Sequence, residues 1–313
     1  MAVWRVDVLP IASRYLVARH KVPYAIKTLS QATLIVLEER SLLHKTFLSG
    51  INTRLVRDLV SEAIVSDVCS QPMIDYFATK LQIDRSKFVW IDNAVDTDRF
   101  LPKGSHEARA EVNLSTFEPV VGYIGSRPSE RGGQYLVELA PSLLAKYPGL
   151  GIVIVGNGPG LGSLKHRARE LGVSSRCVFT GQVPFDDVPL YCNALDVGVS
   201  INDRVDRFAA AELKVRQYVA CGKPVVASAG SNEFLGAHDL GSIVDAADSD
   251  GIESAVTHWL SLSAPERERF RAKAREFACS HLSYEAAVVR RLSLWASLIR
   301  DSGVSGKTGE SLD

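Results

Sequence analysis

The sequence predicts an α/β fold made of two doubly wound halves, each a parallel sheet with helices on both faces. Short β-branched apolar runs alternate with amphipathic stretches over residues 119–228, and residues 1–100 carry a shorter version of the same rhythm. This alternation is typical of βαβ units, and apolar runs without polar interruption indicate strands buried on both faces. The length of 313 residues suits two domains of about 100–200 residues each.

Four strands are expected in the first half, with helices between them. The strands are RVDVLPI (5–11), PYAIKTL (23–29), EAIVSDV (62–68) and KFVWID (87–92). The helices are expected at residues 13–20, 42–59 and 73–81.

The second half repeats the pattern with more strands. They are PVVGYIG (119–125), GIVIVG (151–156), RCVFTG (176–181), DVGVS (196–200), KPVVAS (223–228) and GSIVD (241–245). Helices are expected to begin near Gln134, Leu161, Asp186 and Leu213.

The boundary between the halves is expected within residues 101–118, where LPKGSH supplies proline and glycine and no apolar periodicity appears before Pro119. We therefore expect a first domain over 1–104 and a second over 105–283. Near the end of the second, Ser263 and Glu266 have the spacing of a capping box, which predicts a helix ending near Cys279.

A last helix is expected over 284–301. Val288, Leu292, Trp295 and Ile299 recur there at spacings of three and four residues, which predicts one apolar face. The remaining residues, 302–313, have the composition of a disordered tail.

Composition and charge exclude several classes of protein. Lysine plus arginine and aspartate plus glutamate both total 36, so no global charge favours nucleic acid. Five cysteines without a Cys-x-x-Cys motif argue against disulfides and zinc, and favour a reducing cytoplasm. The sequence has no apolar run of about 18 residues and no signal-peptide pattern. A cytoplasmic protein without a transmembrane segment is expected, and peripheral membrane contact stays open.

Three turns each follow a predicted strand and precede a predicted helix. They are residues 125–133, 156–160 and 208–213. Ligands of open α/β sheets bind at the carboxyl ends of the strands, where helix N-termini present N–H groups to phosphate. Each turn alone is weak evidence, because βα loops need glycine for their geometry.

Four motifs in order resemble the retaining glycosyltransferases of group 1 (family 4), which have the GT-B fold. The motifs are WIDNAVDTDRFLP (90–102), IVIVGNGPGLGSLKHRARELGV (152–173), VFTGQVPFDDVPLYCNALDVGVS (178–200) and ELKVRQYVACGKPVVAS (212–228). The resemblance implies two Rossmann-like domains and transfer of a sugar from a nucleotide-diphosphate donor with retention of anomeric configuration. It also implies that the helix at 284–301 returns to the first domain and buries Val288, Leu292 and Trp295.

The resemblance implies a set of site residues as well. Arg131 and Lys214 match the family's two cations and are the expected catalytic residues, because a departing diphosphate needs fixed positive charge. The donor nucleotide is expected to contact the following residues: Gly125, Arg127, Gly156, Gly158, Val183, Ala211, Glu212, Leu213 and Gln217. No metal and no cofactor are expected, since no Asp-x-Asp pair stands beside the phosphate loops.

The chain departs from the family pattern at several points. Ser126 stands where the family has an arginine, with Arg127 displaced by one. Gln217 stands where a glutamate holds the ribose hydroxyls, and Ala209 replaces its partner glutamate. Residues 3–9 resemble a middle strand of the family's first domain, so that domain is expected to be incomplete.

These departures leave two functions open. One is a glycosyltransferase whose acceptor is an unidentified glycan, lipid or small molecule. The other is a non-catalytic relative that binds a nucleotide sugar or a partner. A nicotinamide-dependent oxidoreductase is disfavoured, because no Gly-x-Gly-x-x-Gly follows a first strand with an acidic residue about twenty positions on.

Overall fold

The computed structural model describes residues 2–5, 24–27, 49–202 and 212–301, and the chain divides into two compact units. The first unit takes the described residues up to Cys69, then Ile74–Asp92 and the segment from Glu285. The second unit takes Ser70–Met73 and Asn93–Tyr284. The predicted segments 13–20 and 302–313 lie outside the described residues.

The division after Asp92 corrects the boundary that the sequence places after residue 104. Residues from Asn93 onward pack with the second unit, because Val95 pairs with Ser283 in a parallel bridge and Phe100 is buried in that unit's core. The proline and glycine of LPKGSH therefore mark a turn inside the second unit.

A parallel sheet of four strands forms the centre of the first unit. Its strands lie in chain order: β1 (Ala2–Arg5), β2 (Tyr24–Lys27), β3 (Val65–Val68) and β4 (Phe88–Trp90). Helices α3 (Ser49–Glu62) and α4 (Gln71–Leu81) precede β3 and β4. The predicted strands at 23–29, 62–68 and 87–92 are confirmed.

The second unit contains a parallel sheet of six strands, in the order β10-β9-β8-β5-β6-β7. The strands are β5 (Val120–Ile124), β6 (Gly151–Val155), β7 (Cys177–Gly181), β8 (Val197–Ser200), β9 (Val225–Ser228) and β10 (Gly241–Val244). The chain runs from β5 to one edge, returns to β8 beside β5, and continues to the other edge. This strand order is that of a Rossmann fold, and the predicted doubly wound sheet is confirmed.

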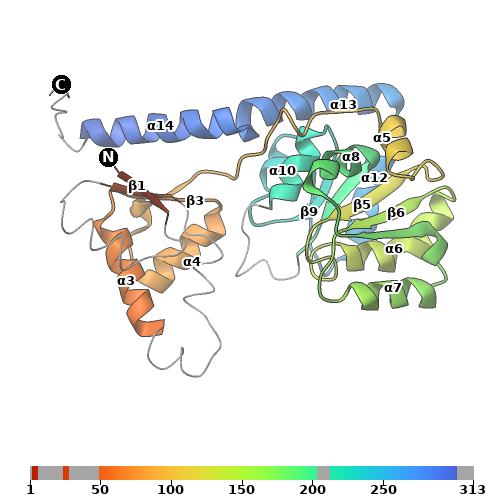
Figure 1. Cartoon of the computed structure of the whole chain (residues 1–313), viewed down its shortest axis with the longest axis horizontal. Coiled ribbons are helices and arrows are strands. Elements are labelled where there is room, and N and C mark those ends of the chain that lie inside the picture. Colours follow the sequence, from red (N-terminus) through yellow and green to blue (C-terminus); the bar gives the residue numbers. More distant parts are fainter. Residues whose placement is uncertain (1, 6–23, 28–48, 203–211, 302–313) are drawn as a thin grey trace. The chain divides into compact units, whose positions relative to one another are not determined.

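Helices cover both faces of this sheet, with α6, α7 and α12 on one face and α8, α10 and α13 on the other (Figure 1). Their bounds are α5 (Ser105–Glu111), α6 (Gly133–Lys146), α7 (Leu161–Glu170), α8 (Val188–Ala194), α10 (Leu213–Ala220), α11 (Phe234–Ala237), α12 (Ser249–Leu260) and α13 (Ala264–Phe277). Coverage on both faces explains why every residue of β5, β6, β8 and β9 is buried.

Helix α5 lies where the sequence shows no apolar periodicity. It buries only Ala108 and Arg109, so it has no apolar stripe for a pattern to detect. The Arg109 guanidinium is 2.5 Å from Asp196 Oδ2 and donates to the Ala194 carbonyl at 2.9 Å. A buried ion pair fixes this helix on the second unit, with Ala108 as its one fully buried apolar residue.

Two predictions concern the end of the second unit and the last helix: the capping box is confirmed, and the burial of one helix face is wrong. Ser263 and Glu266 form the predicted capping box at the start of α13. A turn of π-helix (Ala278–Leu282) then leads into α14 (Tyr284–Asp301). Val288 and Leu292 of α14 are 50% and 56% exposed, so their predicted burial is wrong.

The buried side of α14 is displaced by one residue from the predicted face. Ala287 is buried, and Arg291, Leu294 and Leu298 are half-buried. Of the three residues predicted to be buried, only Trp295 is as much as half-buried. Arg291 Nε donates to Oδ2 of the buried Asp67 at 2.8 Å. This charge-assisted bond turns position 291, rather than 292, toward the first unit.

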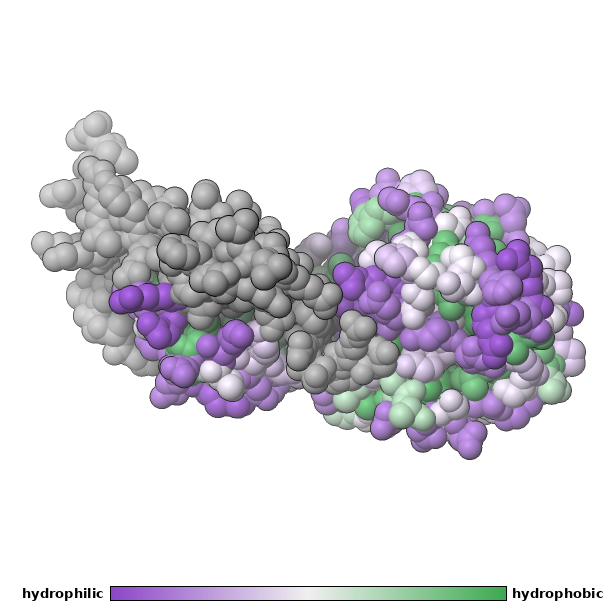
Figure 2. Space-filling model, turned by 90° about the horizontal axis from the view of Figure 1, so that it is seen from below, coloured by the Kyte–Doolittle hydropathy of each residue, from purple (hydrophilic) through white to green (hydrophobic). Residues whose placement is uncertain are grey.

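Two observations concern contact with a membrane: the hydropathy of the surface and the length of the helices. Figure 2 shows hydrophilic and hydrophobic side chains interspersed on the visible face of the second unit. Among the helices that the structure describes, none is both long enough and apolar enough to span a bilayer.

Candidate functional site

The candidate site lies at the carboxyl edge of the six-stranded sheet, which is the edge where β5, β8 and β9 end. Strands β5 and β8 are neighbours, but the connections from them lead to opposite sides of the sheet. Such a switch point leaves a crevice between the two connections, and ligands of open α/β sheets bind there. Arg131 comes from the loop after β5, and Lys214 lies in the first turn of α10, after β8.

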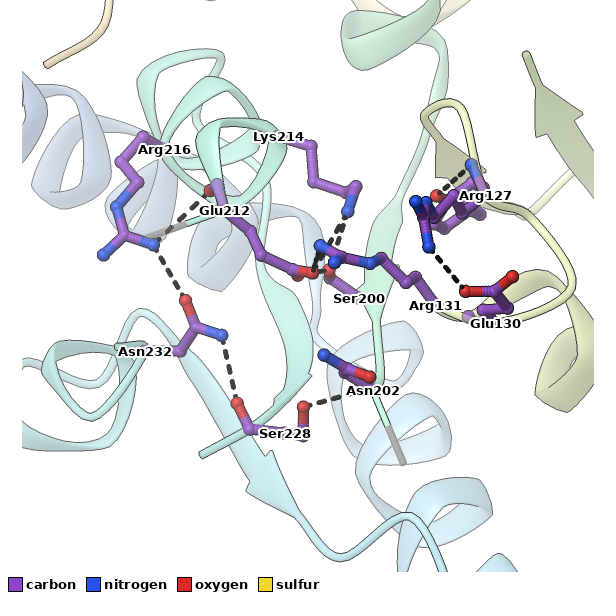
Figure 3. A network of polar contacts seen from close by, with 12 residues as sticks. Arg127, Glu130, Arg131, Ser200, Asn202, Glu212, Lys214, Arg216, Ser228 and Asn232 are labelled. Atoms are coloured by element: carbon purple, nitrogen blue, oxygen red, sulfur yellow. Dashed lines mark hydrogen bonds and ion pairs between the residues drawn. The ribbon is translucent and has the colours of Figure 1, made fainter. Parts of the chain in front are cut away.

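Arg131, Ser200, Glu212 and Lys214 form a compact polar group, which we call the carboxyl-edge cluster (Figure 3). Glu212 lies at its centre. Its Oε1 is 2.9 Å from Arg131 Nη1 and 3.4 Å from Lys214 Nζ, and its Oε2 accepts a hydrogen bond from Ser200 Oγ. The two cations predicted from the sequence are thus brought together, and one carboxylate joins them.

The cluster is largely removed from solvent. The side chains of Arg131, Lys214 and Glu212 are 18%, 12% and 7% exposed. Burial raises the pKa of the Glu212 carboxyl, but Lys214, the Ser200 hydroxyl and Arg131 outweigh it and hold that pKa below its usual value. Burial also lowers the pKa of Lys214, against the opposing attraction of Glu212. Two cations and one carboxylate leave a net charge of +1 in a partly desolvated place.

Tyr123 forms one wall of the cluster. The Lys214 ammonium lies 5.1 Å from the centroid of the Tyr123 ring, a cation–π contact. Burial raises the pKa of the Tyr123 hydroxyl well above its usual range, so it stays protonated. Gly125 passes beside both, since a Cβ there would meet Tyr123 Oη at 2.6 Å and Lys214 Cε at 3.0 Å. Gly125 therefore lets the loop after β5 approach the lysine closely.

Gly156 and Gly158 have a structural explanation in the packing of two loops. A Cβ at Gly156 would overlap the carbonyl oxygen of Gly125, and a Cβ at Gly158 would overlap that of Ser126. Gly156 also has a φ of +121°, a conformation that glycine favours. These glycines let the loop after β6 pack on the loop after β5, so their presence is accounted for without a ligand.

The other predicted contact residues differ in how close they are to the cluster. Arg127 is 58% exposed and pairs with Glu130 at 3.1 Å, outside the cluster (Figure 3). Val183 is half-buried after β7, and Leu213 is 42% exposed at the start of α10. Gln217 is buried in α10, one turn after Lys214. Ala211 lies outside the described residues.

Sequence reasoning missed the side chains of Glu212, Ser200 and Tyr123. Glu212 was expected only as one of the residues in contact with the donor, whereas its carboxylate is the centre of the cluster. An acidic residue two positions before a matched lysine, at the start of a helix, was the available signal. Ser200 and Tyr123 lie on strands read only as apolar runs.

A second buried network supports the cluster from behind. Arg216 Nη1 bonds to Asn232 Oδ1 at 2.8 Å, and Asn232 Nδ2 donates to the Ser228 carbonyl at 3.0 Å (Figure 3). Ser228 Oγ in turn accepts from the Asn202 backbone at 3.0 Å. The network joins α10 to the ends of β8 and β9, which fixes the backbone that carries Glu212 and Lys214.

The cluster's chemistry is that of anion binding. Its cations are largely removed from solvent and held by Glu212, which is suited to stabilising charge on a phosphate oxygen. Within the described ranges, no group of three or more His, Cys, Asp or Glu side chains is placed to hold a metal ion.

The strand order and the position of the cluster define a Rossmann-like α/β protein with a cationic crevice at its switch point. The sequence model of the family "Glycosyl transferases group 1" matches residues 105–277. The chain therefore belongs to this glycosyltransferase family, as its motifs predict.

Curated relatives match between about half and two thirds of the chain. Over 173 residues the chain is 32% identical to a GDP-mannose-dependent alpha-(1-6)-phosphatidylinositol monomannoside mannosyltransferase of Mycolicibacterium smegmatis, covering 52% of this chain and 44% of the relative. It is 28% identical over 233 residues to a 2-deoxystreptamine N-acetyl-D-glucosaminyltransferase of Streptomyces fradiae, covering 69% and 54%. The chain spans about half the length of these curated relatives.

A solved structure identifies the fold over more of the chain. HepE of Anabaena in complex with UDP has a TM-score of 0.74 at 17% identity, covering 94% of this chain and 78% of that one. The predicted GT-B fold is thereby confirmed.

Proposed function

We propose that the protein transfers a sugar from a nucleoside-diphosphate donor to an acceptor, with retention of anomeric configuration. The observation that supports this most is the pair Arg131 and Lys214, held 2.9 and 3.4 Å from one carboxylate oxygen at the switch point of the sheet. Family membership and the sequence resemblance support the reaction type.

In this proposal the cations bind the donor's diphosphate and stabilise it as it leaves. Negative charge on the leaving phosphate grows as the bond to the sugar breaks, so a fixed guanidinium and ammonium help more in the transition state than in the ground state. Glu212 holds both cations in place before the donor arrives. Gln217 is proposed to face the ribose and the backbone at Val183 the base, while Gly125 lets the loop pass close to the diphosphate.

The proposal includes a donor bound without metal and a cytoplasmic location. The Mycolicibacterium relative is named as GDP-mannose-dependent, and the Anabaena structure contains UDP, so both bases are candidates. All five cysteines are free thiols, in keeping with a reducing compartment.

A non-catalytic nucleotide-sugar-binding protein is the second candidate. The observation that favours it is Glu212, whose carboxylate already neutralises one of the two positive charges that a leaving diphosphate would use. Gln217 also offers the ribose no charge-assisted bond.

Calorimetry and a donor-cleavage assay test the proposal and separate the two candidates. UDP and GDP are titrated with EDTA, and again with magnesium, and we expect binding that does not require the metal. Slow release of nucleoside diphosphate from the matching nucleotide sugar supports a transferase, and binding without any release supports the second candidate. NMR of the freed sugar reports the anomer first formed. Binding only with metal contradicts the proposed site.

A further inference from the structure

A second cationic pocket lies at the amino edge of the six-stranded sheet, where β8 and β9 begin. Asp196 and Pro224, which immediately precede those strands, both line it. The strands are parallel, so this edge is opposite the one that carries Arg131 and Lys214. The cavity has a volume of about 190 Å³. It is therefore separate from the proposed donor site and has room for more than a water molecule.

Lys223 reaches this cavity from the turn before β9 and is only 7% exposed. Its Nζ donates to Ser105 Oγ at 2.8 Å. No carboxylate of the described residues lies within ion-pair distance of this ammonium, and the nearby Asp196 is bound to Arg109 at 2.5 Å. Buried charges in proteins are normally paired, because desolvation of a lone ion is costly. Lys223 thus lacks the counter-ion that Lys214 has.

Two arginines add positive charge to the rim of the cavity. Arg267 and Arg271 both line it from α13, one turn apart. Arg271 has only a long contact, 3.7 Å, with the exposed Glu268, and no ion pair joins Arg267 to another described residue. Ala264, the first residue of α13, also borders the cavity, so the positive end of the helix dipole lies there.

One side of the wall is apolar, and the charged side chains of Lys103 and Glu268 also border the cavity. Trp259, Leu262 and Phe270 line one side. The Trp259 indole N–H already donates to Ser242 Oγ at 2.9 Å, so the ring offers the cavity an apolar surface. A cationic floor beside an apolar wall suits a small molecule with an anionic group at one end and a carbon skeleton at the other.

We propose that this cavity binds the phosphate group of a small organic molecule, with Lys223, Arg267 and Arg271 as its cationic ligands. Glu268 lies 3.7 Å from Arg271 and offsets its charge. Lys223 and Arg267 form no ion pair with another described residue, and their two positive charges match a phosphate monoester. The ligand supplies the counter-ion that the protein lacks, so its binding stabilises the second unit by mass action.

The protonation of Lys223 gives the proposal a signature in pH. Burial lowers the pKa of Lys223 to about 8, against the attraction of Asp196 and the Cys221 thiol, and with the repulsion of Arg109 and Arg271. A bound phosphate favours the charged amine and raises that pKa again. Near pH 8.5 the binding reaction should therefore take up a proton.

The test is calorimetry with inorganic phosphate and with a hexose monophosphate, on the full chain. The two ligands distinguish a free ion from a phosphate on a carbon skeleton, and Lys223-dependent binding of either supports the site. We expect Lys223→Met to weaken binding by about ten- to a hundredfold and Arg267→Gln by a smaller factor. The binding enthalpy in two buffers of different ionisation enthalpy gives the number of protons taken up on binding. Near pH 8.5 the parent should take up a proton and Lys223→Met should not.

Arg131→Ala is the control that separates the two edges of the sheet, and it should leave the Lys223-dependent part of phosphate binding unchanged. Binding that disappears in Arg131→Ala would place the phosphate at the carboxyl edge and overturn the proposal. Equal affinity in the parent, Lys223→Met and Arg267→Gln, or no binding of either ligand, would overturn it as well. Arg267 is exposed and forms no ion pair with another described residue, so the Arg267→Gln result does not depend on how the chain tolerates a change at Lys223.

Discussion

The two edges of the six-stranded sheet each carry a buried lysine, and the protein treats the two differently. Lys214 at the carboxyl edge shares the Glu212 carboxylate with Arg131, whereas Lys223 at the amino edge has one hydroxyl, Ser105 Oγ, as its polar partner. The difference shows that a cationic pocket can be made ready in two ways. An internal carboxylate lowers the free-energy cost of burying cations but competes with an anionic ligand for them. Without such a carboxylate the buried cation is more costly, and it is free to bind the ligand.

Removing the internal carboxylate should have the largest effect on stability. Glu212→Ala leaves Lys214 and Arg131 buried side by side without a counter-ion, which should lower the free energy of unfolding by about 3 kcal/mol, the lower end of the range for breaking a buried pair. Denaturant unfolding monitored by tryptophan fluorescence measures it.

The matched control for this variant is Glu130→Ala, which removes an exposed partner of Arg127. It should change the same free energy by less than about 1 kcal/mol, as surface pairs do. Equal losses in the two variants would mean that Glu212 does not neutralise the cluster.

Removing Lys223 should raise the free energy of unfolding instead of lowering it. The pKa of Lys223 falls from its ordinary 10.5 to about 8 in the folded chain, so below pH 8 the charged amine costs up to roughly 3 kcal/mol of stability. Lys223→Met should therefore be more stable than the parent at pH 7 in phosphate-free buffer.

The pH dependence of that difference follows from linkage. Between pH 8 and 10.5 the unfolded chain binds a proton that the folded chain does not, so the parent gains stability as pH rises. The advantage of Lys223→Met should accordingly shrink over this interval and vanish near pH 10.5. An advantage that stays constant with pH would show that Lys223 is not the group responsible.

Much of this fold could be predicted because its strands are buried on both faces. The apolar runs at 119–125, 151–156, 196–200 and 223–228 coincide with β5, β6, β8 and β9, whose residues are all buried. Elements held by ion pairs escaped prediction. Helix α5 is fixed by Arg109, and the contact face of α14 is set by Arg291, and neither interaction appears in a hydrophobic pattern.

The site was predictable only in part for a related reason. Arg131 follows β5 and Lys214 follows β8. These parallel strands are neighbours, so the two residues meet at the carboxyl edge of the sheet. The sequence does not show which atoms of a residue make its contacts, so the central role of the Glu212 carboxylate was not predicted. Lys223 was read only as the start of the strand motif KPVVAS, because burial without a partner is a property of the folded chain.

A carboxylate added at the carboxyl edge should have a smaller effect, and a favourable one if Gln217 faces the ribose. Gln217→Glu replaces a neutral hydrogen bond to a ribose hydroxyl by a charge-assisted one, a gain of about 1 kcal/mol or roughly fivefold in affinity. Calorimetry with the nucleoside diphosphate that binds the parent measures this gain. Unchanged or weaker binding would place Gln217 away from the ribose.

The claim that phosphate charge is held at the carboxyl edge is tested most directly with Arg131→Ala. Glu212 keeps Lys214 and Ser200 as partners in this variant, so the cluster stays satisfied and the fold should persist. Arg127→Ala is the matched control, because Arg127 lies in the same loop but is exposed and paired with Glu130.

The measurement is the dissociation constant of a nucleoside diphosphate and of the corresponding nucleoside, for the parent and both variants. We expect Arg131→Ala to weaken diphosphate binding by about ten- to a hundredfold while nucleoside binding stays nearly the same, and Arg127→Ala to change neither appreciably. Diphosphate binding that is as tight in Arg131→Ala as in the parent would contradict the account, because the charge of the ligand would then be held elsewhere.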